Sequence, residues 1–192
     1  MIGDKWREVR GSEHRQICSI CNVEESMQHI LLECHTNARE IIWERAQELW
    51  PREWREWPKI RLGTILGIGH IALHENGRQP GNGNNENNAP TRKSRGQTRL
   101  LQILISEASH LIWVLRCERV IHRENRQHTN QEINARWKRV INDRLTTDRI
   151  TATKIKRDRT FTKLINATWK KTLEKQGVPH HNWLQRREVF SG

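Results

Sequence analysis

The sequence lacks tyrosine altogether and has only two phenylalanines and four cysteines among its 192 residues. No apolar segment and no signal-type cleavage site follow Met1, so we expect none of the disulfide frameworks of secreted proteins. No run approaches 18 apolar residues, which predicts that no segment spans a membrane. These absences indicate an intracellular protein and leave nuclear and cytoplasmic residence both open.

The common catalytic motifs are absent as well. The sequence has no glycine-rich phosphate loop ending in Lys-Ser/Thr, no Gly-x-Ser-x-Gly elbow and no His-Glu-x-x-His pair. Its carboxylates fall mostly among charges expected on helix surfaces, and no small-molecule substrate site is indicated. We therefore expect no enzymatic activity.

Three cysteines and a histidine lie close together in the pattern Cys18-x2-Cys21-x7-His29-x4-Cys34. A tetrahedral zinc ion takes four such ligands at about 2.0–2.3 Å. Disulfide pairing is the alternative, but three thiols leave one over. The spacing therefore predicts Zn²⁺ held by these four residues, with His35 a minor substitute for either neighbour.

The last two ligands constrain the local backbone. His29 and Cys34 are five residues apart, about 1.4 turns of an α-helix. They converge only if the helix ends or tightens before Cys34. Between the two ligand pairs, Glu24 and Glu25 are interpreted as a solvated helix start, because carboxylates are less favoured where thiolates are available.

Helical periodicity predicts an all-α fold. Apolar spacing favours helices over 38–50, from Thr98 to about Arg126, from residue 130 onward, and over 160–176. The second of these is apolar around most of its circumference and is expected to be central. The glycine-punctuated segment 62–73 fits either a short buried helix or an irregular core segment.

The chain divides into three predicted regions. Residues 1–75 form a zinc-binding knuckle with a helical segment, and residues 98–192 form a basic helical region. Between them, residues 76–97 are so rich in Asn, Gly and Pro that they are predicted to be a flexible, disordered linker.

Nine tryptophans raise the question of base stacking. Five fall on apolar stripes and are predicted core residues: Trp43, Trp50, Trp113, Trp137 and Trp169. Four lie off these stripes or near ends and are candidates for stacking on bases: Trp6, Trp54, Trp57 and Trp183.

Charge is unevenly distributed along the chain. The total is +12, yet residues 1–60 carry nine basic and eleven acidic side chains, whereas residues 129–192 carry fifteen and six. A basic block of this size is typical of phosphate contact, and predicts RNA or DNA as a partner. A solvated basic surface without a partner is the alternative. The candidate nucleic-acid-binding residues are Arg136, Lys138, Arg139, Arg144, Arg149, Lys154, Lys156, Arg157, Arg159, Lys163, Lys170 and Lys171.

Five stretches together resemble a known family. The segments His14–Cys21 and Glu24–Cys34 are similar to the zinc-binding region that follows the polymerase and ribonuclease H parts of non-LTR retrotransposon reverse transcriptases. The segments 38–50, 103–121 and 132–149 resemble the C-terminal tails of such polyproteins in mushroom-forming fungi. The resemblance places the metal ligands on the same four residues as the spacing does.

Departures from the family indicate what this chain does not do. Reverse transcription needs a Tyr-x-Asp-Asp turn, and ribonuclease H needs an acidic cluster on a mixed sheet; neither pattern is readable here. The resemblance therefore implies a non-catalytic accessory domain that grips template RNA or target DNA. The alternative is a protein–protein docking module, for example on the retroelement's catalytic domains, with no nucleic-acid binding. A relic of a retroelement is a third possibility.

Overall fold

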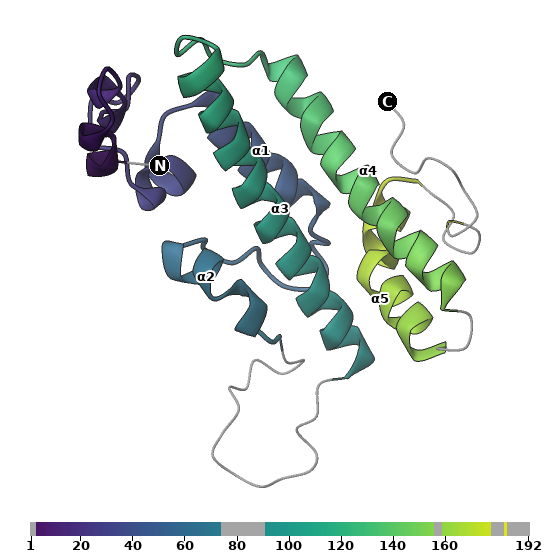
Figure 1. Ribbon diagram of the computed structural model, residues 1–192. Coiled ribbons are helices and arrows are strands. Elements are labelled where there is room, and N and C mark those ends of the chain that lie inside the picture. Colours follow the sequence, from purple (N-terminus) through teal and green to yellow (C-terminus); the bar gives the residue numbers. More distant parts are fainter. Residues whose placement is uncertain (1–2, 74–90, 156–158, 178–182, 184–192) are drawn as a thin grey trace, which may run out of the picture.

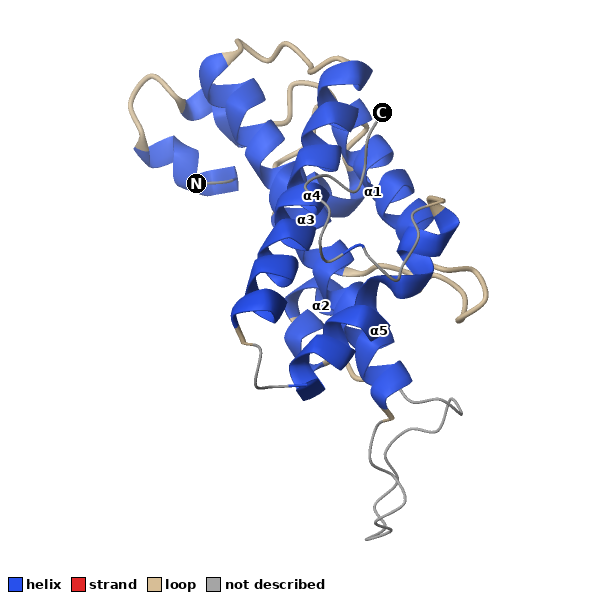
Figure 2. Cartoon of the chain, turned by 90° about the vertical axis from the view of Figure 1, so that its right-hand side faces the viewer, coloured by secondary structure: helices blue, strands red, loops and turns tan. Residues whose placement is uncertain are grey.

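The computed structural model describes residues 3–73, 91–155, 159–177 and 183. Every named element in these residues is helical, and the only β-type pairing among them is an isolated bridge between Ile17 and Glu24 (Figure 2). The predicted all-α fold with a small Cys/His knuckle is thus confirmed. The elements in chain order are η1 (Gly3–Glu8), η2 (Glu13–Gln16), η3 (His29–Glu33), α1 (Asn37–Leu49), α2 (Leu62–Leu66), η4 (Ile68–His70), α3 (Arg92–His122), α4 (Asn130–Lys154) and α5 (Arg159–Lys175).

Helix α3 is the central element, and α1, α4 and α5 pack around it (Figure 1). Its side chains are buried on several sides, as the sequence predicts; Leu100, Leu104 and Ile105 have no exposed surface. One hydrophobic core contains residues from before and after the predicted linker, including Ile42 of α1 and Trp169 of α5. The knuckle and the basic helices are therefore joined by packing and not by the chain alone.

Helix α3 is also long and apolar enough, by length and composition alone, to cross a membrane. Its most apolar 18-residue stretch has a mean hydropathy of 1.3, and 61% of that stretch is buried inside the structure. The central helix of a packed bundle meets the same criterion because it buries apolar side chains on most of its faces.

The predicted linker, residues 76–97, extends too far toward the C-terminus. Residues 76–90 lie outside the described part, but α3 begins at Arg92 and not at Thr98. Its N-cap is Thr91, whose hydroxyl accepts a hydrogen bond from the Ser94 amide at 3.2 Å. Small and polar residues of this first turn resemble a linker by composition, yet Ser94 and Gly96 are buried, and Gly96 lies against Ala167 of α5.

At Gly96, α3 and α5 approach each other so closely that no side chain fits between them. A Cβ at this position would lie 2.7 Å from the backbone carbon and oxygen of Ala167. We expect Gly96→Ala to destabilise the fold by about 1–3 kcal/mol, although alanine normally favours a helix. Urea unfolding followed by circular dichroism measures the change.

The matched control is Gly63→Ala in α2, where no atom lies within 4 Å of the added Cβ. That substitution should be neutral or stabilise by up to about 1 kcal/mol. If Gly96→Ala were equally well tolerated, the close packing of α3 on α5 would be wrong.

The remaining helices agree with their predicted positions within a few residues. The predicted helix over 38–50 is α1, the one expected from residue 130 is α4 with Thr129 as N-cap, and the one expected over 160–176 is α5. Gly177 follows α5 with φ +72°, the conformation in which glycine commonly terminates a helix.

The segment 62–73 contains a helix, but not a buried one. It forms α2 and the short η4, and Leu66 is 75% exposed. The segment is tied to α3 by Gln102, whose Nε2 donates to the carbonyls of Gly69 and Ile71 at 3.4 and 3.3 Å.

The tryptophans divide differently from the prediction. Trp50, Trp137 and Trp169 are buried as expected, whereas Trp43 and Trp113 are only half-buried. Two predicted stacking candidates, Trp6 and Trp183, are buried at 7% and 1% exposure and are unavailable to a base. Half-buried Trp54 and Trp57 pack edge-on against Trp50, with ring centroids 5.2 and 6.0 Å away.

Candidate metal centre

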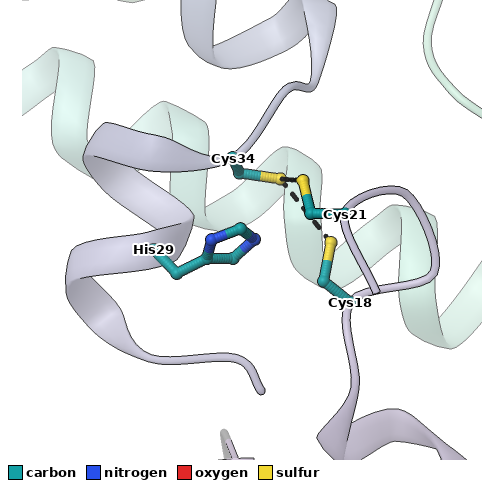
Figure 3. A group of neighbouring side chains, drawn as sticks. All are labelled: Cys18, Cys21, His29 and Cys34. Carbon is teal, nitrogen blue, oxygen red and sulfur yellow. Dashed lines mark hydrogen bonds between the residues drawn. The ribbon is translucent and has the colours of Figure 1, made fainter. Parts of the chain in front are cut away.

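The first ligand pair lies on a tight turn. The Cys18 amide donates to the Val23 carbonyl, and the Asn22 amide donates to the Cys18 carbonyl, both at 2.8 Å. Asn22 adopts φ +54°, a left-handed conformation that asparagine tolerates better than most residues. The turn folds the chain back so that the thiols of Cys18 and Cys21 point to the same side (Figure 3).

The second ligand pair is positioned by a turn wider than an α-helix. Residues His29–Glu33 form a π-helical turn, and the Cys34 amide donates to the His29 carbonyl at 2.7 Å. As expected, the helix ends before Cys34, at Glu33, although its last turn is widened and not tightened. A π-turn closes over five residues, which brings positions 29 and 34 to one side.

The four predicted ligands converge. Their donor atoms all lie within 4.8 Å of one another, and Figure 3 shows the side chains directed toward a common point. The Cys34 sulfur is 3.7 Å from that of Cys18 and 3.8 Å from that of Cys21. A tetrahedral ion at about 2.3 Å from each sulfur would separate the sulfurs by roughly 3.8 Å. Nε2 of His29 is buried without a hydrogen-bond partner among the described residues, as an unused ligand atom would be.

The thiol and imidazole environments also suit a metal ion. Burial, together with the neighbouring Cys18 and Cys21, raises the pKa of Cys34 to about 12. Burial also tends to raise the pKa of Cys18. Hydrogen bonds from the backbone N–H groups of Cys21 and Ile20 outweigh this effect, so that the pKa of Cys18 is lowered. Burial lowers the pKa of His29, which keeps its imidazole neutral. Three crowded thiols ionise together only when a cation compensates them.

This set of four ligands is typical of structural and not of catalytic zinc sites. Four protein ligands satisfy a tetrahedral zinc ion, and three thiolates favour zinc over hard cations such as Mg²⁺. His35 is exposed and outside the cluster; its amide instead donates to the Cys21 sulfur at 3.3 Å. The residues present therefore fit zinc, which when bound would fix the knuckle's two turns to each other.

Glu25 corrects the sequence interpretation. Glu24 is exposed, as expected of a solvated residue, but Glu25 is only 3% exposed and forms an ion pair with Arg116 of α3. Arg119, one turn further along α3, is buried beside it. Sequence reasoning missed this cluster because Glu25 and Arg116 are 91 residues apart; the only signal was a pair of arginines three residues apart that follows the apolar part of the helix.

The predicted nucleic-acid-binding residues fall into three groups. Arg136, Arg139, Lys170 and Lys171 lie within 4 Å of a carboxylate, and Arg136 binds Glu118 through both terminal nitrogens, which lowers the pKa of Glu118. Lys156 and Arg157 lie outside the described residues. The others are Lys138, Lys154, Arg159 and Lys163, which are exposed, and Arg144 and Arg149, which are half-buried.

The fold adds basic residues that the sequence interpretation had assigned to the linker. The N-terminus of α3 lies at the same end of the bundle as the C-terminus of α4 and the N-terminus of α5 (Figure 1). It contributes the exposed Arg92, Lys93 and Arg95. We call this surface the basic end; its residues are Arg92, Lys93, Arg95, Arg99, Arg149, Lys154, Arg159 and Lys163.

The sequence matches no protein-family model, no curated protein and no solved structure. A function for this chain can therefore be inferred only from its own residues and their contacts.

Proposed function

We propose that this chain is a non-catalytic, zinc-stabilised accessory domain that binds RNA or DNA through phosphate contacts. The observation that carries the proposal is the basic end. Three helix ends bring its eight cations together, and the described parts of α3 before Glu107, of α4 after Asp148 and of α5 before Glu174 contain no carboxylate. Asp148 itself is buried and paired with Arg99.

Helix polarity supports the same proposal. The N-termini of α3 and α5 carry partial positive charge, so arginine and lysine there oppose the helix dipole and cost stability. Arg92, Lys93, Arg95 and Arg159 occupy such positions. An anion bound at this end would be attracted both by the cations and by the helix termini.

A groove beside this end offers a place for a phosphate backbone. It has a volume of about 550 Å³ and lies along α3, with Arg95 and Arg99 from α3, Arg144 from α4 and Leu164 from α5 in its wall. Thr98 and Ser106 add hydroxyls, and Glu107, further along α3, adds one carboxylate. Phosphate contacts of this kind hold a backbone without reading its sequence.

Zinc has the supporting role in this proposal. It would close the knuckle, which has too few residues to fold on a core of its own. The resemblance to the tail of a non-LTR retrotransposon reverse transcriptase agrees with such a role, and we propose that origin for the chain.

The test is fluorescence anisotropy of the zinc-loaded full chain with short labelled RNA and DNA over a salt series. We expect micromolar or tighter binding at low salt, with a log–log salt slope of about −3 or steeper. The triple variant Arg95→Gln, Arg159→Gln, Lys163→Gln should make the slope shallower by about 2–3 and weaken binding at least tenfold.

A control triple removes the same charge elsewhere. Lys5, Arg10 and Arg126 are exposed and belong to the knuckle and to the opposite end of the bundle. Their replacement by glutamine should change affinity by less than about threefold. Equal losses in both triples would mean that net charge and not the basic end drives binding. No binding at low salt would favour the protein-docking alternative.

A further inference from the structure

Two arginines of α3 are buried directly behind the Cys/His cluster. Arg116 is 6% and Arg119 is 3% exposed, and the only carboxylate within 4 Å of either among the described residues is Glu25. Arg116 hydrogen-bonds to Glu25 and lies with its guanidinium carbon 5.5 Å from the Trp113 ring centroid. Arg119 Nη2 is 3.8 Å from Glu25 Oε1, too far for a hydrogen bond.

The protein groups do not satisfy these two cations. Arg119 Nη1 donates to the Ser19 hydroxyl at 3.0 Å, which joins α3 to the turn between Cys18 and Cys21. Four other guanidinium nitrogens, Nε and Nη1 of Arg116 and Nε and Nη2 of Arg119, are buried without a hydrogen-bond partner in the described structure. A buried cation that lacks a counter-charge is strongly unfavourable. Glu25, with one negative charge, offsets only one of the two positive charges.

The metal centre has the complementary charge. A divalent zinc ion with three thiolates and a neutral imidazole carries a net charge of −1. Arg116, Arg119 and Glu25 together carry +1. Without a metal ion and with its thiols protonated, the Cys/His cluster is uncharged and cannot compensate the two arginines. A third arginine, Arg39, also lies near the cluster, because its Nε donates to the Cys34 carbonyl. Its Nη2 is 3.0 Å from Glu40 Oε1, so its charge is already paired with a carboxylate.

We propose that Arg116 and Arg119 are the counter-charges of the metal-bound thiolates, so that metal binding and docking of the knuckle on α3 stabilise each other. In this arrangement the arginines are positioning residues and not ligands. The negatively charged zinc–thiolate centre offsets the positive charge of a buried pocket between two parts of the chain, and loss of the metal ion with protonation of the thiols leaves that positive charge uncompensated. The centre is thereby suited to a divalent ion with three thiolates.

The proposal makes opposite predictions for substitutions of opposite charge. Removing Arg119 leaves the thiolates less compensated, so Arg119→Met should weaken zinc binding by about tenfold or more. Removing the negative charge of Glu25, which repels the thiolates, should tighten zinc binding severalfold in Glu25→Gln. If the cluster served only packing, both substitutions would weaken zinc binding.

The experiment measures the zinc dissociation constant of the full chain by competition with a chelating dye at fixed pH and salt. Arg119→Lys keeps the charge and should stay within about threefold of the wild type. The matched control is Arg136→Met, which removes an arginine paired with a carboxylate of α3 but at the α3–α4 contact. It should leave zinc affinity within twofold, on the order of measurement scatter.

Two results would overturn the proposal. One is unchanged zinc affinity in Arg119→Met; the other is an equal loss in Arg119→Met, Arg119→Lys and Glu25→Gln. If Arg119→Met does not fold, the comparison of Arg119→Lys with Glu25→Gln decides, because a charge effect requires that Glu25→Gln bind zinc more tightly than the wild type.

Discussion

Cys21→Ser is expected to abolish stoichiometric zinc and to unfold the N-terminal third of the chain. Cys21 would supply one of the three thiolates, and its sulfur lies 3.8 Å from that of Cys34. A hydroxyl is a much poorer zinc ligand, and binding of structural zinc supplies on the order of 10 kcal/mol to folding. Metal content by mass spectrometry should fall from about one equivalent to near zero, while helical circular dichroism from α3 to α5 is largely retained.

Cys117→Ser is the control for this prediction. Cys117 is the fourth cysteine, half-buried on α3 and outside the ligand cluster. Its replacement should leave one equivalent of zinc bound. Retention of a full equivalent by Cys21→Ser would refute the ligand assignment, and loss of zinc in both variants would mean that the thiols act through stability and not coordination.

Asp148→Ala is expected to destabilise the helical bundle by about 3 kcal/mol or more, because a half-buried arginine and a buried indole lose their acceptor together. Both carboxylate oxygens of Asp148 accept from Arg99 at 2.6 Å, and one also accepts from Nε1 of Trp169 at 2.7 Å. The residue thus joins α4 to α3 and α5 at one point. The midpoint and slope of urea unfolding measure the loss.

Asp143→Ala tests whether the effect is specific. Asp143 lies on the same helix, but its side chain is 73% exposed and its contact with Arg139 is 3.8 Å long. We expect a change below about 0.5 kcal/mol, as for most exposed ion pairs. Similar losses for the two aspartates would show that Asp148 has no special role in holding the three helices together.

Local pattern was sufficient for much of the fold. The spacing of apolar residues predicted α1, α4 and α5 within a few residues, and the apolar circumference of α3 predicted its central place. Such patterns depend on residues three or four positions apart, which a sequence displays directly. The four Cys/His residues that could hold a metal ion were predicted for the same reason, because they lie within seventeen residues of one another in the sequence.

Residue composition gave wrong predictions where contacts between residues far apart in the sequence determine the structure. The stretch from Thr91 to Gln97 has the polar and small residues of a linker, but Gly96 is needed for the approach of Ala167, which is 71 positions later. Trp183 has no apolar stripe around it, yet it is 1% exposed. The partners of these residues cannot be identified without the tertiary structure.

The sequence by itself determined the helices, the ligand set and the basic character of the second half of the chain, because each is a matter of residue type and short spacing. Only the tertiary structure decided which charged groups lie close to one another. It placed Glu25 against Arg116 and Arg119 behind the cysteines, and it gathered cations from three helix ends into the basic end. The physical reason is that burial and electrostatic interaction depend on distance in space, and α3 brings together groups that are far apart along the chain.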